Sequence, residues 1–88
     1  GEFCMIASGV NINSTRHGTE KQSYIKEQPH SHGFVELEDD VWIGSGASIL
    51  INTKIGTGAV VSSNSLVSGE VPAFAICVGV PAKVIQYR

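Results

Sequence analysis

The amino-acid sequence predicts an all-β fold in which one short strand and one turn repeat as a coil. An aliphatic residue returns at every sixth position, and the members of this set are Leu37, Ile43, Ile49, Ile55, Val61 and Val67. A second small or aliphatic residue follows four positions after each of the first five, at Val41, Ala47, Thr53, Ala59 and Ser65. A period of six matches neither the 3.6-residue period of a helix nor the two-residue period of a strand, so it indicates an internal repeat.

Glycines and uncharged polar residues support this coil. Four glycines fall between the aliphatic positions, at Gly44, Gly46, Gly56 and Gly58. Corners between short strands require positive backbone φ angles, which glycine adopts without strain. Only Lys54 is charged between Val41 and Gly69, so polar side chains can stack in ladders without repulsion. Each inward aliphatic side chain is then expected to stack on its equivalents about 4.8 Å above and below.

Composition places the 88-residue chain near the lower limit for one independently folded domain. A formal net charge of -2, with scattered cations, gives no reason to expect nucleic acid or an anionic membrane as a partner. The longest apolar run, residues 73–78, is far shorter than the roughly 18 residues of a membrane span, so a soluble, cytoplasmic protein is expected. Cys4 and Cys77 lack metal-ligand spacing and are expected to be reduced, packed side chains.

The repeat is interrupted once. Ile6 and Ile12 carry one more piece of it, but Ile12 and Leu37 are 25 positions apart. The pattern disappears within residues 13–34, which are predicted to form a long protruding loop, and such loops are usually functional or disordered. All three histidines of the chain lie in this segment: His17, His30 and His32.

These features divide the chain. Residues 1–3 read as a remnant of cloning, and residues 4–88 form a single domain. The hexad coils are placed at 35–68 and a short closing segment at 69–88, because Pro72 cannot donate a hydrogen bond to a strand ladder.

Three motifs then occur in a fixed order: Val41-Trp42-Ile43-Gly44, Ile55-Gly56-Thr57-Gly58-Ala59, and Val78-Gly79-Val80-Pro81-Ala82-Lys83-Val84-Ile85. Together they resemble the hexapeptide-repeat acyltransferases, most closely the O-acetyltransferases of sugars, polysaccharides and some antibiotics. The resemblance covers roughly residues 5–87. It implies a left-handed parallel β-helix, usually a homotrimer, with acetyl-CoA as co-substrate. Members of the family are generally about twice as long, so the chain resembles a C-terminal portion of one.

The resemblance also implies roles for individual residues. His17, within Ser14-Thr15-Arg16-His17-Gly18, matches the catalytic histidine, which would act as the general base on an acceptor hydroxyl. Ser45 matches a position near the acetyl thioester and is expected to contact the oxyanion or the cofactor. Trp42 matches a position beside the active-site groove. Ser63 and Ser68 match positions that line the pantetheine arm, and Lys83 matches a basic residue near the nucleotide phosphates.

Two further segments, residues 30–32 and 36–40, allow other interpretations. His30-Ser31-His32 could place two imidazoles on one side of an extended segment and share a metal ion, but a chain returning to the coil is favoured and no metal is expected. An acidic cluster at residues 36–40 is expected to be a solvated face. The leading function is O-acetyl transfer to a carbohydrate or similar small molecule. The alternatives are a non-catalytic truncated β-helix module that serves trimer assembly, and a serine acetyltransferase-like enzyme.

Overall fold

The computed structural model describes the backbone of residues 1–12, 15–17 and 30–88, and the side chains of residues 1–12 and 33–88. Within these residues the chain contains strands and no helix. The strands are β1 (Met5–Ile6), β2 (Asn11–Ile12), β3 (Thr15–His17), β4 (His30–His32), β5 (Val35–Leu37), β6 (Trp42–Ile43), β7 (Ser48–Ile49), β8 (Thr53–Ile55), β9 (Val60–Val61), β10 (Leu66–Val67), β11 (Glu70–Val71), β12 (Ala75–Gly79) and β13 (Ala82–Tyr87).

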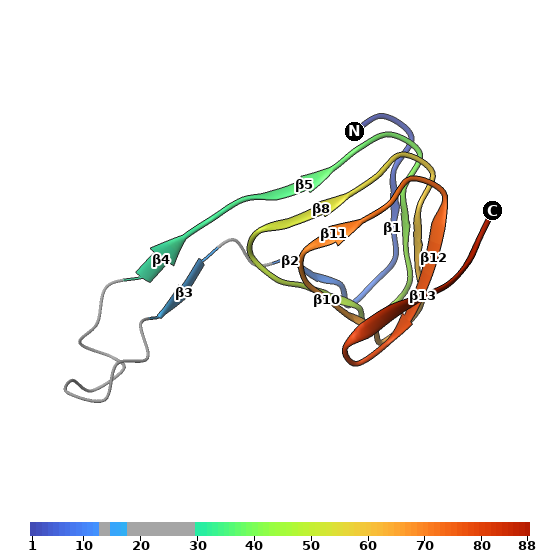
Figure 1. Cartoon of the computed structure of the whole chain (residues 1–88). Coiled ribbons are helices and arrows are strands. Elements are labelled where there is room, and N and C mark those ends of the chain that lie inside the picture. Colours follow the sequence, from blue (N-terminus) through green and yellow to red (C-terminus); the bar gives the residue numbers. More distant parts are fainter. Residues whose placement is uncertain (13–14, 18–29) are drawn as a thin grey trace.

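The strands wind into a three-sided parallel β-helix (Figure 1). Face A contains β1, β6, β9, β12 and β13, face B contains β2, β7 and β10, and face C contains β5, β8 and β11. Within each face the strands of successive coils run parallel, except that β13 is antiparallel to β12. Ile43 pairs with Val61 and Ile49 with Val67, so one coil spans 18 residues, or three hexads. The six-residue period is therefore one side of a triangular coil.

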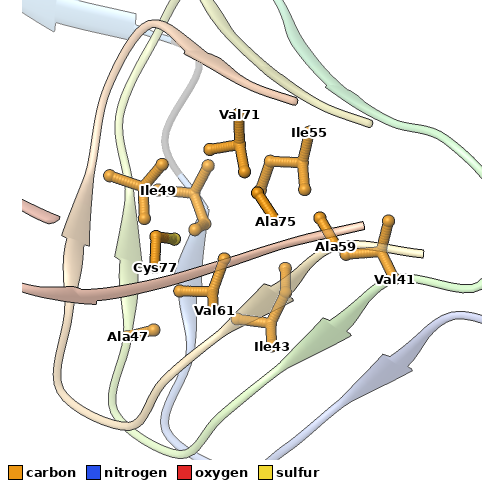
Figure 2. Close-up of a cluster of buried hydrophobic side chains, with 11 residues drawn as sticks. Val41, Ile43, Ala47, Ile49, Ile55, Ala59, Val61, Val71, Ala75 and Cys77 are labelled. Atoms are coloured by element: carbon orange, nitrogen blue, oxygen red, sulfur yellow. The ribbon is translucent and has the colours of Figure 1, made fainter. Parts of the chain in front are cut away.

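Both repeated positions of the hexad point into the coil and form its core (Figure 2). Ile43, Ile49, Ile55 and Val61 are fully buried, and Val67 is 2% exposed. The second position is equally enclosed, because Val41, Ala47, Thr53, Ala59 and Ser65 are all buried. The predicted core is thus confirmed, except that Leu37 is only partly buried and packs against it. Ile6 and Ile12 occupy the same inward columns but are 49% and 45% exposed, because they lie in the first coil of the stack.

The corners depend on two different properties of glycine. Left-handed backbone recurs every six residues, at Asp40, Gly46, Asn52, Gly58 and Asn64. Asparagine and aspartate tolerate this conformation because their short polar side chains bond locally. Gly44 and Gly56 do not have positive φ, which corrects their predicted role. At these positions a Cβ atom would lie 2.7 Å from the Ser63 nitrogen and 2.6 Å from the Ala73 nitrogen, so glycine allows adjacent coils to approach.

An arm leaves the coil between β2 and β5. Ile12 pairs with Ile49 across 37 positions instead of the usual 18, so 37 − 18 = 19 residues are inserted without disturbing the register. Residues 13–34 were predicted to be a loop, whereas β3 and β4 within them form an antiparallel pair. This pair projects from the corner between faces B and C, away from face A (Figure 1). The hexad pattern could not show it, because the two strands pair with each other and not with the coil.

The stack continues beyond the hexads. β11 pairs with β8 and β12 pairs with β9, so two more parallel strands follow Ser68 before the chain reverses. Pro72 comes directly after β11, where no ladder hydrogen bond is needed. A turn with a cis peptide bond between Val80 and Pro81 then leads into β13. At the other end, the Glu2 carbonyl accepts a 2.8 Å hydrogen bond from the Asp40 N–H.

No helix among the described residues is long and apolar enough to cross a membrane.

The core predicts a stabilising substitution. Thr53 is fully buried, and its hydroxyl has no hydrogen-bond partner among the described residues. We expect Thr53→Val, which keeps the shape and removes the unsatisfied hydroxyl, to raise the free energy of unfolding by about 1 kcal/mol. A rise of about 4–8 °C in Tm, measured by circular dichroism, corresponds to that change in a domain of this size.

The matched control is Ser65→Ala. The buried Ser65 hydroxyl accepts a 3.1 Å hydrogen bond from the Gly79 N–H, so its removal should lower stability by about 1 kcal/mol. If Thr53→Val and Ser65→Ala lowered the free energy of unfolding equally, the different roles assigned to the two hydroxyls would be contradicted.

Candidate functional site

Face A carries an apolar row on its outer side. Met5, Trp42, Val60 and Ile76 are register partners in four successive coils, and each directly precedes a residue of the inward column. Because successive residues of a strand point to opposite faces, these four side chains lie on the outside. Trp42 is 52% exposed. An exposed aromatic in a continuous apolar row is a surface suited to binding.

A groove of about 540 Å³ lies along this row. Phe3, Met5, Trp42, Val60 and Ile76 contribute apolar walls, and Asp40 and Arg88 add charged groups. The Arg88 guanidinium donates a 2.9 Å hydrogen bond to the Gly58 carbonyl and lies 3.6 Å from an Asp40 carboxylate oxygen. The groove is thus apolar, with one ion pair beside it, and has the volume of a small-molecule site.

Serines stack at the corner between faces A and B. Ser45 and Ser63 are 18 positions apart, and the Asn64 N–H donates a 2.9 Å hydrogen bond to the Ser45 carbonyl. Both serines are exposed. Lys83 belongs to the same corner, because it pairs with Val78 at the end of β12, and the preceding Cys77 carbonyl accepts a hydrogen bond from Ser62. Ser45, Ser63 and Lys83 therefore follow one another along this corner, on successive strands next to the row that contains Trp42.

The other two residues singled out in the sequence lie elsewhere. Ser68 is exposed between β10 and β11, at the corner between faces B and C. His17 ends β3 in the arm that leaves that same corner. Its backbone is described, whereas its side chain lies outside the described residues. Within one chain, the arm projects from the side of the coil opposite face A (Figure 1).

The acidic cluster is largely engaged in local contacts. The Glu38 carboxylate accepts a 3.1 Å hydrogen bond from the Thr57 N–H and lies 3.9 Å from the Lys54 ammonium. Glu36 and Glu70 flank Lys54 in register on the outer side of face C, so that face alternates in charge. Among the side chains that the structure describes, no group of three or more His, Cys, Asp or Glu could hold a metal ion.

The two thiols differ in environment. Cys77 is buried, and desolvation raises the pKa of its thiol above the ordinary value. Cys4 is partly buried, and its sulfur donates a 3.1 Å hydrogen bond to the Glu38 carbonyl. Both are free cysteines, and neither is among the residues that line the groove.

Comparison with known proteins shows which proteins resemble this chain in sequence and fold. No family model matches the chain. It is 35% identical over 94 residues to WbbJ of Escherichia coli K12, a protein named for O-acetyl transfer in lipopolysaccharide biosynthesis, with 98% of this chain and 48% of WbbJ covered. It is 37% identical over 105 residues to a chloramphenicol acetyltransferase of Morganella morganii, with 100% of this chain and 50% of the relative covered. A solved galactoside acetyltransferase in complex with coenzyme A superposes with a TM-score of 0.91 at 28% identity, covering 99% of this chain and 43% of that one.

The chain belongs to the hexapeptide-repeat acyltransferases. The predicted left-handed parallel β-helix is confirmed by the same superposition. The chain spans about half the length of the relatives it matches.

The family resemblance pointed to Trp42, but the other members of its row, Met5, Val60 and Ile76, were not predicted from the sequence. The signal was available, because Trp42 and Val60 stand one position before inward aliphatics and 18 positions apart. Met5 and Ile76 were hidden by the inserted arm and by the shorter last coil, in which Val61 and Cys77 are only 16 positions apart. Phe3 was set aside with residues 1–3, although it lines the groove.

The packing at the corner between faces A and B predicts different stability effects for substitutions at the neighbouring residues Gly44 and Ser45. A Cβ atom on Gly44 would lie 2.7 Å from the Ser63 nitrogen and 2.9 Å from its hydroxyl, so Gly44→Ala should force the coils apart and cost about 1–3 kcal/mol of stability. Ser45→Ala, at the exposed next position, should change stability by less than about 0.5 kcal/mol. Urea unfolding of both variants measures the difference, and a Gly44→Ala variant as stable as the parent would contradict the close packing of this corner.

Proposed function

We propose that the chain takes part in acetyl-CoA-dependent O-acetyl transfer to a hydroxyl of a carbohydrate or similar small molecule. The observation that carries this proposal is the alignment of Ser45, Ser63 and Lys83 along one corner, beside the groove that contains Trp42. It is supported by the superposition on an acetyltransferase that holds coenzyme A, and by O-acetyl transfer in the name of a relative.

Along this corner, successive coils present polar groups that an extended cofactor could contact one after another. Exposed hydroxyls at Ser45 and Ser63 repeat with the spacing of the coils and can contact the amides of a pantetheine arm. Lys83 stands at the last coil of this corner, where its ammonium can pair with phosphate as a point charge. Ser68, at the opposite corner, would reach a cofactor held against a neighbouring copy.

The chemistry is direct transfer. The His17 imidazole removes the proton from the acceptor hydroxyl, and the alkoxide oxygen attacks the thioester carbonyl carbon. The tetrahedral oxyanion is stabilised by a main-chain N–H near Ser45. Collapse breaks the carbon–sulfur bond, and the coenzyme A thiolate receives the proton that the imidazolium holds. The acetyl ester and free coenzyme A leave, and no covalent enzyme intermediate forms.

The position of the arm favours a site shared between copies of the chain. β3 and β4 project from the corner opposite face A, so the strand that ends in His17 lies on the other side of the coil from face A in the same chain (Figure 1). A homotrimer would place the arm of one copy over the face A groove of the next. The apolar row on face A would then be covered at the same interface. A cytoplasmic location stays a prediction from composition.

Cofactor binding is tested by thermal unfolding with acetyl-CoA. At a hundred times its dissociation constant, a ligand adds about 2.7 kcal/mol to the free energy of unfolding, so Tm should rise by roughly 10 °C or more. Lys83→Ala should reduce this shift, whereas Lys54→Ala, on face C, should leave it unchanged. No shift at millimolar acetyl-CoA would instead favour a module that only assembles subunits.

The shared site is tested by complementation. His17→Ala should lower acetyl transfer to sugar acceptors by at least about 10²-fold through loss of the base, while retaining the thermal shift with acetyl-CoA. Lys83→Glu should lose activity at low acetyl-CoA by repelling the phosphates. Mixing the two variants under conditions of subunit exchange should restore part of the activity, because hybrid interfaces combine an intact His17 with an intact Lys83. Recovery no greater than the sum of the parents would show that both residues act within one chain.

A further inference from the structure

The groove on face A adjoins the corner between faces A and B that carries Ser45 and Ser63, called here the serine corner. Ser45 follows Trp42 by three positions, so their Cα atoms are at most about 11 Å apart. Asp40 precedes Trp42 by two positions and lines the groove together with its partner Arg88. The serine corner and the ion pair therefore lie on opposite sides of the apolar row, and a ligand that enters from the serine corner crosses the row first.

The row is suited to hydrocarbon and not to a sugar ring. Met5 and Trp42 are exposed, and Val60 and Ile76 are partly buried beside them. Val60 and Ile76 have no hydrogen-bonding group in their side chains, and Met5 has only a weakly accepting sulfur. The hydroxyls of a sugar would lose their water here without gaining partners, which costs free energy. A hydrocarbon chain loses no hydrogen bond and gains free energy when it leaves water.

The two charged groups of the groove oppose each other. The Arg88 guanidinium donates a 2.9 Å hydrogen bond to the Gly58 carbonyl and lies 3.6 Å from an Asp40 carboxylate oxygen. Because the two charges have opposite sign, the groove has no net attraction for an anion or a cation. The ion pair also limits the length of an apolar ligand, since hydrocarbon that extended onto it would remove water from charged groups.

We propose that the groove holds the hydrocarbon tail of a medium-length acyl group whose coenzyme A portion lies along the serine corner. The protein thus accepts straight-chain acyl-CoA donors longer than acetyl-CoA, such as hexanoyl-CoA and octanoyl-CoA. This inference rests on the proposed function, because the serine corner must hold the coenzyme A. In the transfer, the acceptor oxygen bonds to the acyl carbonyl carbon, the carbon–sulfur bond breaks, and the coenzyme A thiolate takes the proton that the acceptor hydroxyl loses.

The inference is tested by the affinity of the whole chain for acetyl-, butyryl-, hexanoyl- and octanoyl-CoA, measured by isothermal titration calorimetry. A fully buried methylene group strengthens binding about fourfold, and a half-covered one about twofold. Because octanoyl-CoA has roughly six more methylene groups than acetyl-CoA, it should bind at least about 50-fold more tightly.

Trp42 reports where the acyl tail binds, because it is the only tryptophan of the sequence. Its exposed ring should emit at shorter wavelength when octanoyl-CoA covers it, but not with acetyl-CoA. Val60→Ser makes the middle of the row polar and should reduce the ratio of octanoyl-CoA to acetyl-CoA affinity at least about fivefold. The matched control is Leu66→Ser, which replaces a partly buried outer aliphatic residue on face B and should keep the parent ratio.

The outcomes separate this inference from the proposed function. If the parent binds acetyl-CoA but gains less than about threefold with octanoyl-CoA, the inference is overturned and the proposed function stands. Unchanged Trp42 emission with octanoyl-CoA, or equal loss of the affinity ratio in Leu66→Ser, would also overturn it, because the acyl tail would then bind outside the groove. Absence of binding for every thioester at millimolar concentration would overturn the proposed function as well.

Discussion

Everything in this molecule depends on the stacking of one coil on the next in a fixed register. In the regular coils each inward side chain meets its equivalent 18 residues away, so Ile43 packs on Val61 and Ile49 on Val67. Hydrogen bonds between coils, such as that from the Gly44 N–H to the Val61 carbonyl at 2.8 Å, hold the spacing along the axis. A coil shifted by one residue would turn every core side chain outward, so the register is strongly specified.

The same stacking distributes chemistry over three outer surfaces. Face A presents the apolar row of Met5, Trp42, Val60 and Ile76. Face B presents Asn11, Ser48 and Leu66, and face C presents Glu36, Lys54 and Glu70. A charged surface with alternating sign is well solvated, whereas an exposed apolar row is stabilised when something covers it. Face A is therefore the surface on which binding and assembly are both proposed.

The sequence was most informative where one residue type is demanded by a repeated environment. Six aliphatics in register predicted the core, and their five followers predicted its second layer, because both sets face inward in every coil. It was least informative where pairing is not periodic. The β3–β4 ribbon contains no repeat from which it could be predicted. Gly44 is needed because a neighbouring coil lies close to it, and Gly46 because its φ angle is positive. No local sequence pattern distinguishes these two roles. The site residues came from family resemblance, and the proposal that the arm of one copy meets the groove of another could be made only from the fold.

The insertion between Ile12 and Leu37 has a wider consequence. Nineteen extra residues leave the corner, yet Ile12 still pairs with Ile49 and Leu37 with Ile55, so the coil accommodates a long insertion and keeps its register. Closing a longer excursion costs little, since doubling its length adds only about 0.6 kcal/mol of entropy. Such a corner is therefore a suitable insertion site. Protein engineers could exchange the arm for another of different length and reactivity while the β-helix stays intact.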